Sequence, residues 1–264
     1  MDLGLKGNIA VVSGSTAGIG LAIATALAAE GASVVINGRT EARVNAAMGR
    51  IRGEVAGADV RGVAADLGTL EGVKTFLNRA PEADILVNNL GIFEVKSFGE
   101  ITDADWLRFF EVNVLSGVRL ARHYLPLMRE KNWGRVIFIS SESAANIPVE
   151  MIHYGVTKTA QVALARGLAE SVAGTGITVN SILAGPTASE GAGNFLREVA
   201  RQRGVTTASV GKEFFEKVRP SSLLKRFEKP EEIAAVVAFV ASAQGAIING
   251  AALRAEGGVV RSVL

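Results

Sequence analysis

The chain has 264 residues, of which 48% are hydrophobic and 20% are charged, and its formal net charge is +2. This composition provides a sizeable apolar core and excludes an intrinsically disordered chain. The sequence has no cysteine and only two histidines, His123 and His153, which excludes disulfides and thiolate metal sites, so we expect no bound metal.

Short apolar runs that are typical of strands alternate with segments of helical periodicity along the chain. We predict strands at 9–13, 33–37, 60–64, 85–88, 136–140, 178–183 and 251–255. Helical periodicity is clearest at 21–30, 106–128, 157–172 and 231–243. This alternation predicts an α/β fold of the Rossmann type, in which a doubly wound, mostly parallel seven-stranded sheet has helices on both faces. Because no linker or repeat divides residues 1–264, we expect a single domain.

A glycine-rich turn follows the first predicted strand and leads directly into the first predicted helix. It reads Ser13-Gly14-Ser15-Thr16-Ala17-Gly18-Ile19-Gly20. Such glycines allow a tight turn, close approach of a pyrophosphate to the backbone, and close packing of a helix whose N-terminal amides attract phosphates. The residues predicted to bind a dinucleotide here are Gly14, Ser15, Thr16, Gly18, Ile19 and Gly20. A tight strand-to-helix connection without a ligand would use the same residues.

The second predicted strand ends in Asn37-Gly38-Arg39-Thr40, which contains no carboxylate. In dinucleotide-binding folds an acidic residue at this point binds the 2′-hydroxyl of NAD, whereas an arginine can pair with the 2′-phosphate of NADP. Arg39 therefore favours NADP(H) over NAD(H), and the alternative is that it only stabilises a surface turn. Asp66 and Leu67 follow the third strand, where Asp66 is interpreted either as an adenine contact or as a helix cap.

Polar residues also follow the fourth predicted strand, in the segment Asn88-Asn89-Leu90-Gly91. A parallel sheet binds ligands at its carboxyl edge, where this segment is expected to lie. Asn88 is expected to tie strands together, and Asn89 or Gly91 to line the cofactor site, although an ordinary turn favours the same residues. Asn113 belongs to an apolar predicted helix, where a buried amide requires hydrogen-bonding partners, either structural or catalytic.

Ser141, Tyr154 and Lys158 are the main candidates for catalysis. Ser141 follows the fifth predicted strand, and Tyr154 and Lys158 are four residues apart, so a helix places these two on one face. A free phenol ionises at about pH 10, so a tyrosine that transfers protons at neutral pH requires a nearby cation. We expect Lys158 to be that cation and to lower the pKa of Tyr154.

Over essentially its whole length the chain resembles the short-chain dehydrogenase/reductase family. The resemblance rests on the glycine loop, on the segment 88–91, and on the set Asn113, Ser141, Tyr154 and Lys158. It implies that Tyr154 is the catalytic acid/base and that Lys158 also binds the nicotinamide ribose. It further implies that Ser141 orients the substrate carbonyl, that Asn113 helps to hold a proton-relay water, and that the protein is a homotetramer or homodimer.

The segment after the sixth predicted strand departs from the family pattern and reads Ala184-Gly185-Pro186-Thr187. Gly185, Pro186 and Thr187 are predicted to contact the cofactor, with Thr187 or Ser189 binding the nicotinamide amide. Residues 187–226 are expected to form an irregular substrate loop within the domain.

These features predict an NAD(P)-dependent oxidoreductase that interconverts a carbonyl and an alcohol. The alternatives are a 3-oxoacyl-thioester reductase as the specific identity and a dinucleotide-binding regulator without catalysis. Basic residues are scattered, and no apolar run approaches the roughly 20 residues that span a bilayer, so binding to nucleic acid or membrane is not expected. The lack of cysteine and of a signal pattern favours the cytoplasm.

Overall fold

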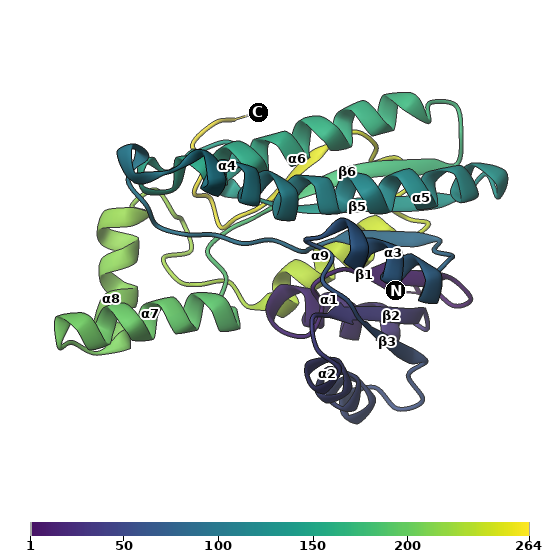
Figure 1. The fold of residues 1–264 in the computed structure, drawn as a ribbon, viewed down its shortest axis with the longest axis horizontal. Coiled ribbons are helices and arrows are strands. Elements are labelled where there is room, and N and C mark those ends of the chain that lie inside the picture. The colour runs from purple at the N-terminus through teal and green to yellow at the C-terminus, as the bar shows by residue number, and fades with distance from the viewer. Residues whose placement is uncertain (1, 264) are drawn as a thin grey trace.

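The structure is a computed structural model in which residues 2–263 are described. Within this range, seven strands form one parallel sheet in the order β3-β2-β1-β4-β5-β6-β7 (Figure 1). The strands are β1 (Ile9–Val12), β2 (Ser33–Gly38), β3 (Val60–Ala64), β4 (Ile85–Asn88), β5 (Gly134–Ser141), β6 (Ile177–Ala184) and β7 (Ala252–Ala255). The strand order reverses between β1 and β4, and sheets of this kind bind ligands outside the carboxyl ends at that point.

Helices cover both faces of the sheet (Figure 1). They are α1 (Gly18–Ala29), α2 (Glu41–Glu54), α3 (Leu70–Arg79), α4 (Asp103–Phe110), α5 (Ser116–Glu130), α6 (Ile152–Ser171), α7 (Glu190–Arg203), α8 (Thr207–Glu213) and α9 (Pro230–Ala241). α1, α2 and α9 bury their apolar side chains on one face, and α3, α5 and α6 on the other. α7 and α8 extend from one end of the sheet, at the left of Figure 1.

The central strands are continuous apolar runs because helices cover them on both faces. β4, β5 and β6 are buried along their entire length, and Ile85, Leu86 and Val87 have no exposed surface. Each such side chain stabilises the fold by roughly 1.5–3 kcal/mol. β7 lies at the edge of the sheet and alternates between exposed and half-buried residues. The buried centre thus holds the carboxyl ends of the strands in fixed positions.

The Rossmann-type fold and all seven predicted strands are confirmed, and the ends of the strands differ from the predicted ones by no more than two residues. The four predicted helices are present as α1, α4 with α5, α6 and α9. The expectation that residues 187–226 are irregular was wrong, because this segment contains α7, α8 and a π-helical turn at Phe214–Val218. Its role as a substrate segment stays a prediction. Side chains of Ser189 and Thr206 cap α7 and α8, although few apolar residues mark either helix in the sequence.

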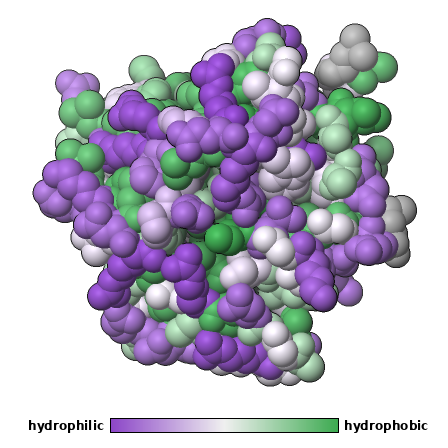
Figure 2. Space-filling model, turned by 90° about the vertical axis from the view of Figure 1, so that its right-hand side faces the viewer, coloured by the Kyte–Doolittle hydropathy of each residue, from purple (hydrophilic) through white to green (hydrophobic). Residues whose placement is uncertain are grey.

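The surface carries no large apolar area on the face that Figure 2 shows, where hydrophilic residues dominate and hydrophobic ones are scattered. No helix within residues 2–263 is long and apolar enough to cross a bilayer. The same residues contain no group of three or more histidine, aspartate or glutamate side chains that could hold a metal ion.

Candidate active site

The turn between β1 and α1 borders a cleft at the carboxyl ends of β1 and β4. Gly14 has a φ of +61°, a left-handed conformation that favours glycine. A Cβ at Gly20 would lie 2.4 Å from Asn89 Nδ2 and 2.6 Å from the Gly14 carbonyl oxygen, so only glycine lets α1 approach this closely. No side chain caps the N-terminus of α1, which leaves its first amides available to an anion. These features fit the phosphates of a dinucleotide.

This dinucleotide cleft has a volume of about 460 Å³ and is lined by most of the predicted cofactor residues. Those residues are Gly14, Thr16, Gly18, Ile19, Gly20, Arg39, Asp66, Leu67, Asn89 and Gly91. The side chain of Ser15 is buried and does not line the cleft. Its hydroxyl donates to the Val12 carbonyl oxygen at 2.6 Å and accepts from the Asn37 amide at 2.9 Å, so it holds the loop in place and is not free for a cofactor.

Two arginines line the cleft beyond the end of β2. Arg43 donates to Thr16 Oγ1 at 3.5 Å and forms an ion pair with Glu190 of α7 at 3.0 Å. Arg39 is exposed and makes no hydrogen bond or ion pair with any residue from 2 to 263. Arg39 is therefore the cation that remains available to a ligand at this end of the cleft.

Asp66 lines the cleft at the end of β3. Its Oδ1 accepts a hydrogen bond from the Gly68 amide at 3.0 Å. The N-cap of α3 is Thr69, whose side chain accepts from the Gly72 amide, so the interpretation of Asp66 as a helix cap was wrong. A contact with adenine stays a prediction.

Asn89, and not Asn88, ties β4 to the glycine loop. Asn89 Nδ2 donates to the carbonyl oxygens of Ser13 at 3.1 Å and Gly14 at 3.0 Å. The side-chain amide of Asn88 is buried, and neither of its polar atoms has a partner within the described range. The prediction that Asn88 ties strands together was therefore wrong, because the neighbouring asparagine makes these bonds.

The candidate catalytic residues come together where β5 and α6 meet the cleft. Ser141 ends β5, Tyr154 and Lys158 lie in the first half of α6, and all three line one pocket together with Gly91 and Gly185. A hydrogen bond joins the Tyr154 phenol to Ser141, and Lys158 Nζ lies 5.6 Å from the centroid of the Tyr154 ring. This catalytic pocket shares lining residues with the dinucleotide cleft, so the two are continuous.

Burial shifts the pKa values of Tyr154 and Lys158 in opposite directions. It raises the pKa of Tyr154 to about 12, and the hydrogen bond to Ser141 opposes this shift. Burial lowers the pKa of Lys158 to about 8. The expected lowering of the Tyr154 pKa by Lys158 is not seen. Burial of the phenol is the main cause of its raised pKa, and the Lys158 ammonium donates to the Ile139 carbonyl oxygen and to Gln161 Oε1. At neutral pH the phenol therefore carries a proton that it can donate, and Lys158 is mainly charged.

Asn113 lies in a π-helical turn, Glu111–Leu115, between α4 and α5. Its side-chain Oδ1 accepts from the Ile92 amide at 2.7 Å, and its Nδ2 donates to the Ile92 carbonyl oxygen and to Thr157 Oγ1, both at 3.0 Å. The amide thus connects the segment after β4 to α6. The Asn113 carbonyl oxygen accepts from Gln161 Nε2 at 2.6 Å, and Gln161 Oε1 accepts from Lys158 Nζ at 3.1 Å.

Comparison with known proteins agrees with this geometry. A family model described as short chain dehydrogenase matches residues 8–199. The chain belongs to the short-chain dehydrogenase family. Its parallel sheet, glycine loop and clustered serine, tyrosine and lysine therefore belong to an oxidoreductase.

Several members of the short-chain dehydrogenase family resemble the chain over nearly its full length. The uncharacterized oxidoreductase YvaG of Bacillus subtilis (strain 168) is 49% identical, with 100% of each chain covered. The 3-oxoacyl-[acyl-carrier-protein] reductase FabG of Aquifex aeolicus is 31% identical over 98% of this chain and 100% of its own. The structure of L-sorbose reductase from Gluconobacter frateurii, complexed with NADPH and L-sorbose, superposes with a TM-score of 0.94 at 32% identity, with 100% of each chain covered.

Two residues of the short-chain dehydrogenase site, Gln161 and Arg219, were not predicted from the sequence, and Glu142 was interpreted only as framework or pocket wall. Gln161 bridges Lys158 and Asn113, and its position three residues after Lys158 on the same helix is a signal that could have identified it. Glu142 and Arg219 form an ion pair of 2.7 Å beside Ser141, and each side chain is at most 6% exposed. Because 77 residues separate them, no spacing in the sequence indicates this pair.

Glu228 fixes the segment that contains Gly185, Pro186 and Thr187. Its amide donates to the Pro186 carbonyl oxygen, its carbonyl oxygen accepts from the Ala188 amide, both at 2.8 Å, and its Oε2 accepts from the Gly185 amide at 3.1 Å. Burial raises the pKa of the Glu228 carboxyl to about 7. Gly185 and Thr187 line the catalytic pocket, so the hydrogen bonds of Glu228 fix the position of this part of the pocket wall.

Glu228→Gln is expected to make the stability of the protein less dependent on pH. Because the folded pKa of about 7 exceeds the ordinary value of 4.5, the folded state binds this proton more tightly, and the free energy of unfolding falls as pH rises between these values. In the wild type this fall in the free energy of unfolding is on the order of 1–3 kcal/mol, and Glu228→Gln should not show it. Urea unfolding at about pH 5 and about pH 8 measures the difference in the free energy of unfolding between the two pH values. Glu231→Gln, at an exposed carboxylate of α9, is the control, and equal pH dependence in wild type and Glu228→Gln would contradict the prediction.

Proposed function

We propose that the protein catalyses the NADP(H)-dependent interconversion of a ketone or aldehyde and an alcohol. The observation that carries this proposal is the convergence of Ser141, Tyr154 and Lys158 on a pocket continuous with the dinucleotide cleft. When bound, the nicotinamide supplies or accepts the hydride. The similarity to a reductase whose structure contains NADPH and L-sorbose supports the same reaction class.

The residues around this pocket would have distinct roles in the reaction. The Ser141 hydroxyl binds the carbonyl oxygen of the substrate, and the Tyr154 phenol donates a proton to that oxygen during reduction and takes it back during oxidation. The Lys158 ammonium stabilises the phenolate that reduction leaves behind. The hydrogen bond from Lys158 to Gln161 and the contacts of Asn113 hold these groups in place.

The preference for NADP(H) follows from the arginines at the end of β2. A 2′-phosphate beside Arg39 would gain a charge-assisted hydrogen bond, and residues 37–40 at the end of β2 contain no carboxylate to bind a free 2′-hydroxyl. Arg43 also lines the cleft, but it is already paired with Glu190. Arg39 is thus the residue on which the preference depends.

Arg39→Ala is expected to lower kcat/KM with NADPH about 10- to 100-fold, because the variant loses a charge-assisted hydrogen bond to the phosphate. Activity with NADH should stay within about threefold, because NADH has no 2′-phosphate. Steady-state rates with both cofactors and a panel of ketones and aldehydes measure this and also test the proposed reaction. Arg52→Ala, at an exposed arginine of α2 that lines no part of the dinucleotide cleft, is the matched control. A wild-type enzyme that prefers NADH would refute the NADP(H) proposal.

A 3-oxoacyl-thioester reductase is the second candidate identity. The similarity to the Aquifex aeolicus FabG protein favours it, and the aromatic side chains of Phe195 and Phe214 beside the catalytic pocket could contact an acyl chain. A non-catalytic regulator has no observation in its favour, since such a protein needs no hydrogen bond between Ser141 and Tyr154. Binding of NADPH without turnover of any carbonyl compound would support the regulator.

The protein is further proposed to be a cytoplasmic homotetramer or homodimer. The lack of cysteine is consistent with a reducing compartment. By the family resemblance, the helical segments 106–128 and 157–172 are the candidate interfaces. Leu107 lies in the first of them and is 73% exposed, which supports self-association. Light scattering of the purified protein measures the oligomeric state.

A further inference from the structure

A second pocket, with a volume of about 680 Å³, also borders Tyr154. Aromatic and aliphatic side chains from the loop after β4, from α7 and from the residues around the second π-helical turn make most of its wall. They include Phe93, Val95, Phe195, Leu196, Phe214 and Phe227. Because Ser141, Tyr154 and Gly185 line both this pocket and the catalytic pocket, it is where the part of the substrate beyond the carbonyl must lie.

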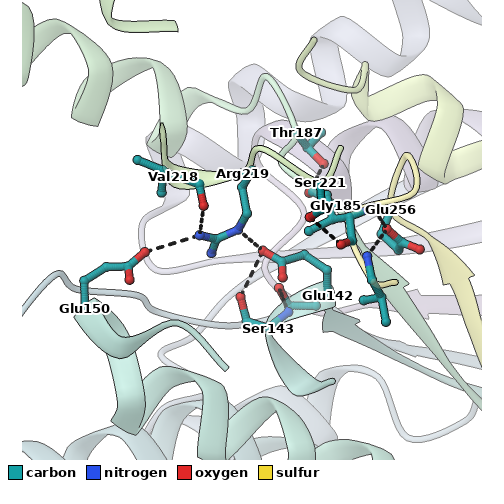
Figure 3. A network of polar contacts seen from close by, with 12 residues as sticks. Glu142, Ser143, Glu150, Gly185, Thr187, Val218, Arg219, Ser221 and Glu256 are labelled. Atoms are coloured by element: carbon teal, nitrogen blue, oxygen red, sulfur yellow. Dashed lines mark hydrogen bonds and ion pairs between the residues drawn. The ribbon is translucent and has the colours of Figure 1, made fainter. Parts of the chain in front are cut away.

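One wall of this substrate pocket is polar and consists of Glu142, Glu150 and Arg219, which we call the acid–arginine wall (Figure 3). Arg219 Nε donates to Glu142 Oε1 at 2.7 Å, and Arg219 Nη1 donates to Glu150 Oε1 at 3.3 Å. Figure 3 shows the guanidinium between the two carboxylates. The side chains of Arg219 and Glu142 are 6% and 4% exposed, whereas that of Glu150 is 34% exposed.

The charge of this wall disfavours a carboxylate on the substrate. One guanidinium faces two carboxylates, so Arg219 has no unbalanced positive charge to offer. Lys217 also lines the pocket, but its side chain is 72% exposed and paired with Glu213. An acidic substrate would therefore bring a further carboxylate next to Glu142 and Glu150 in a poorly solvated site, where like charges repel strongly.

The hydrogen-bonding groups of the wall instead suit a neutral hydroxyl. Arg219 Nη2 donates no hydrogen bond within residues 2–263, although Nε and Nη1 both do. Glu150 has a second carboxylate oxygen without a side-chain partner in the same range. A hydroxyl both donates and accepts, so it can satisfy a carboxylate oxygen and a guanidinium N–H together, which neither a carboxylate nor an alkyl group can do.

We propose that the substrate is an uncharged hydroxy ketone or hydroxy aldehyde whose hydroxyl binds Glu150 and Arg219 while its carbon chain packs against the phenylalanines. Glu142 positions Arg219 through the buried ion pair. This assignment rests on the proposed carbonyl reductase function, and it names the substrate class for the same site. It predicts that a hydroxyl increases turnover and that a carboxylate at the same position prevents it.

The test uses three matched sets of methyl ketones that differ in the group at the far end of the chain. The hydroxylated members are hydroxyacetone, 4-hydroxy-2-butanone and 5-hydroxy-2-pentanone. Their acidic counterparts are pyruvate, acetoacetate and levulinate, and their apolar counterparts are 2-butanone, 2-pentanone and 2-hexanone. Rates with NADPH are expected to show at least one hydroxy ketone with kcat/KM about 10-fold or more above both counterparts, since the buried polar groups are then paired.

Glu150→Gln is the variant that assigns this preference to the wall. It removes one negative charge from a partly exposed position and is therefore expected to fold, which thermal unfolding checks. The ratio of kcat/KM for the hydroxy ketone to that for the matched acid should fall about fivefold or more, mainly through KM, because repulsion of the acid is reduced. Glu142→Gln, which keeps a hydrogen bond to Arg219, should shift the ratio in the same direction.

Glu71→Gln is the matched control, because it removes a carboxylate from an exposed ion pair with Lys74 on α3, outside the substrate pocket. It should leave the selectivity ratio unchanged. Equal or faster reduction of the acid in every matched set, or an unchanged ratio in Glu150→Gln, would overturn the assignment and leave the proposed carbonyl reductase function standing. Absence of turnover with any carbonyl compound, together with measurable NADPH binding, would overturn both.

Discussion

Tyr154→Phe is expected to lower kcat about 10²- to 10⁴-fold, which is the range for loss of a general acid. The substitution removes only the hydroxyl that hydrogen-bonds with Ser141 and leaves the ring in place between Phe93 and Lys158. The measurement is the rate of NADPH oxidation with the best substrate of the ketone panel. The effect should appear in kcat and in kcat/KM alike, because the proton is transferred only in the transition state.

The variant must also be shown to bind its cofactor and to fold. Binding of NADPH, followed by fluorescence titration, should change less than about threefold, since the dinucleotide cleft is lined mainly by residues of other segments. Thermal unfolding should stay close to that of the wild type. If Tyr154→Phe turns over at the wild-type rate, Tyr154 is not the acid/base and the proposed mechanism is wrong.

Lys158→Met is expected to lower kcat about 10²- to 10³-fold, a typical effect of removing one charge that stabilises a transition state. Methionine keeps most of the buried volume of Lys158 and removes the ammonium, which donates to the Ile139 carbonyl oxygen at 2.9 Å and to Gln161 Oε1 at 3.1 Å. Without this cation, the phenolate that forms at Tyr154 is stabilised less, and Arg219, which is paired with Glu142, is the remaining positive charge that lowers the pKa of Tyr154. Gln161→Leu should show a smaller loss, because the ammonium remains and only its position is less fixed.

The pH profile distinguishes this electrostatic role from a structural one. Because burial lowers the pKa of Lys158 to about 8, the ammonium loses its proton as pH rises through that value. The rate of ketone reduction by the wild type should therefore fall above about pH 8, whereas Lys158→Met should be slow and nearly independent of pH in this range. A decrease with the same midpoint in both proteins would show that Lys158 is not the titrating group.

Much of the fold could be predicted because its information is local. The runs Ile85-Leu86-Val87 and Val136-Ile137-Phe138 are apolar without interruption, which is typical of strands covered on both faces. α7 and α8 were missed for the opposite reason. They are partly exposed and carry few apolar residues, so the local signals were limited to their caps at Ser189 and Thr206 and, for α7, the left-handed Gly204 at its end.

The candidate site could be predicted only in part, because some of its residues are close in the sequence and others belong to distant elements. Tyr154 and Lys158 lie within one turn of the same helix, so their proximity follows from their spacing. Asn113 and Ser141 belong to other elements, and the family resemblance, not any spacing, linked them to that pair. The sequence did not distinguish Asn88 from Asn89, because only the packing of β4 against the glycine loop decides which amide reaches Ser13.

The sequence by itself determined the positions of the strands and of the helices with clear apolar periodicity, the position of the glycine turn and the identity of the groups able to transfer a proton. These properties depend on residue type and on separations of a few residues, which helix and strand geometry convert directly into distances. Only the tertiary structure decided the environment of those groups. The raised pKa of Tyr154, the lowered pKa of Lys158 and the pairing of Glu142 with Arg219 all depend on burial and on contacts between distant segments, and such contacts exist only once the chain has folded.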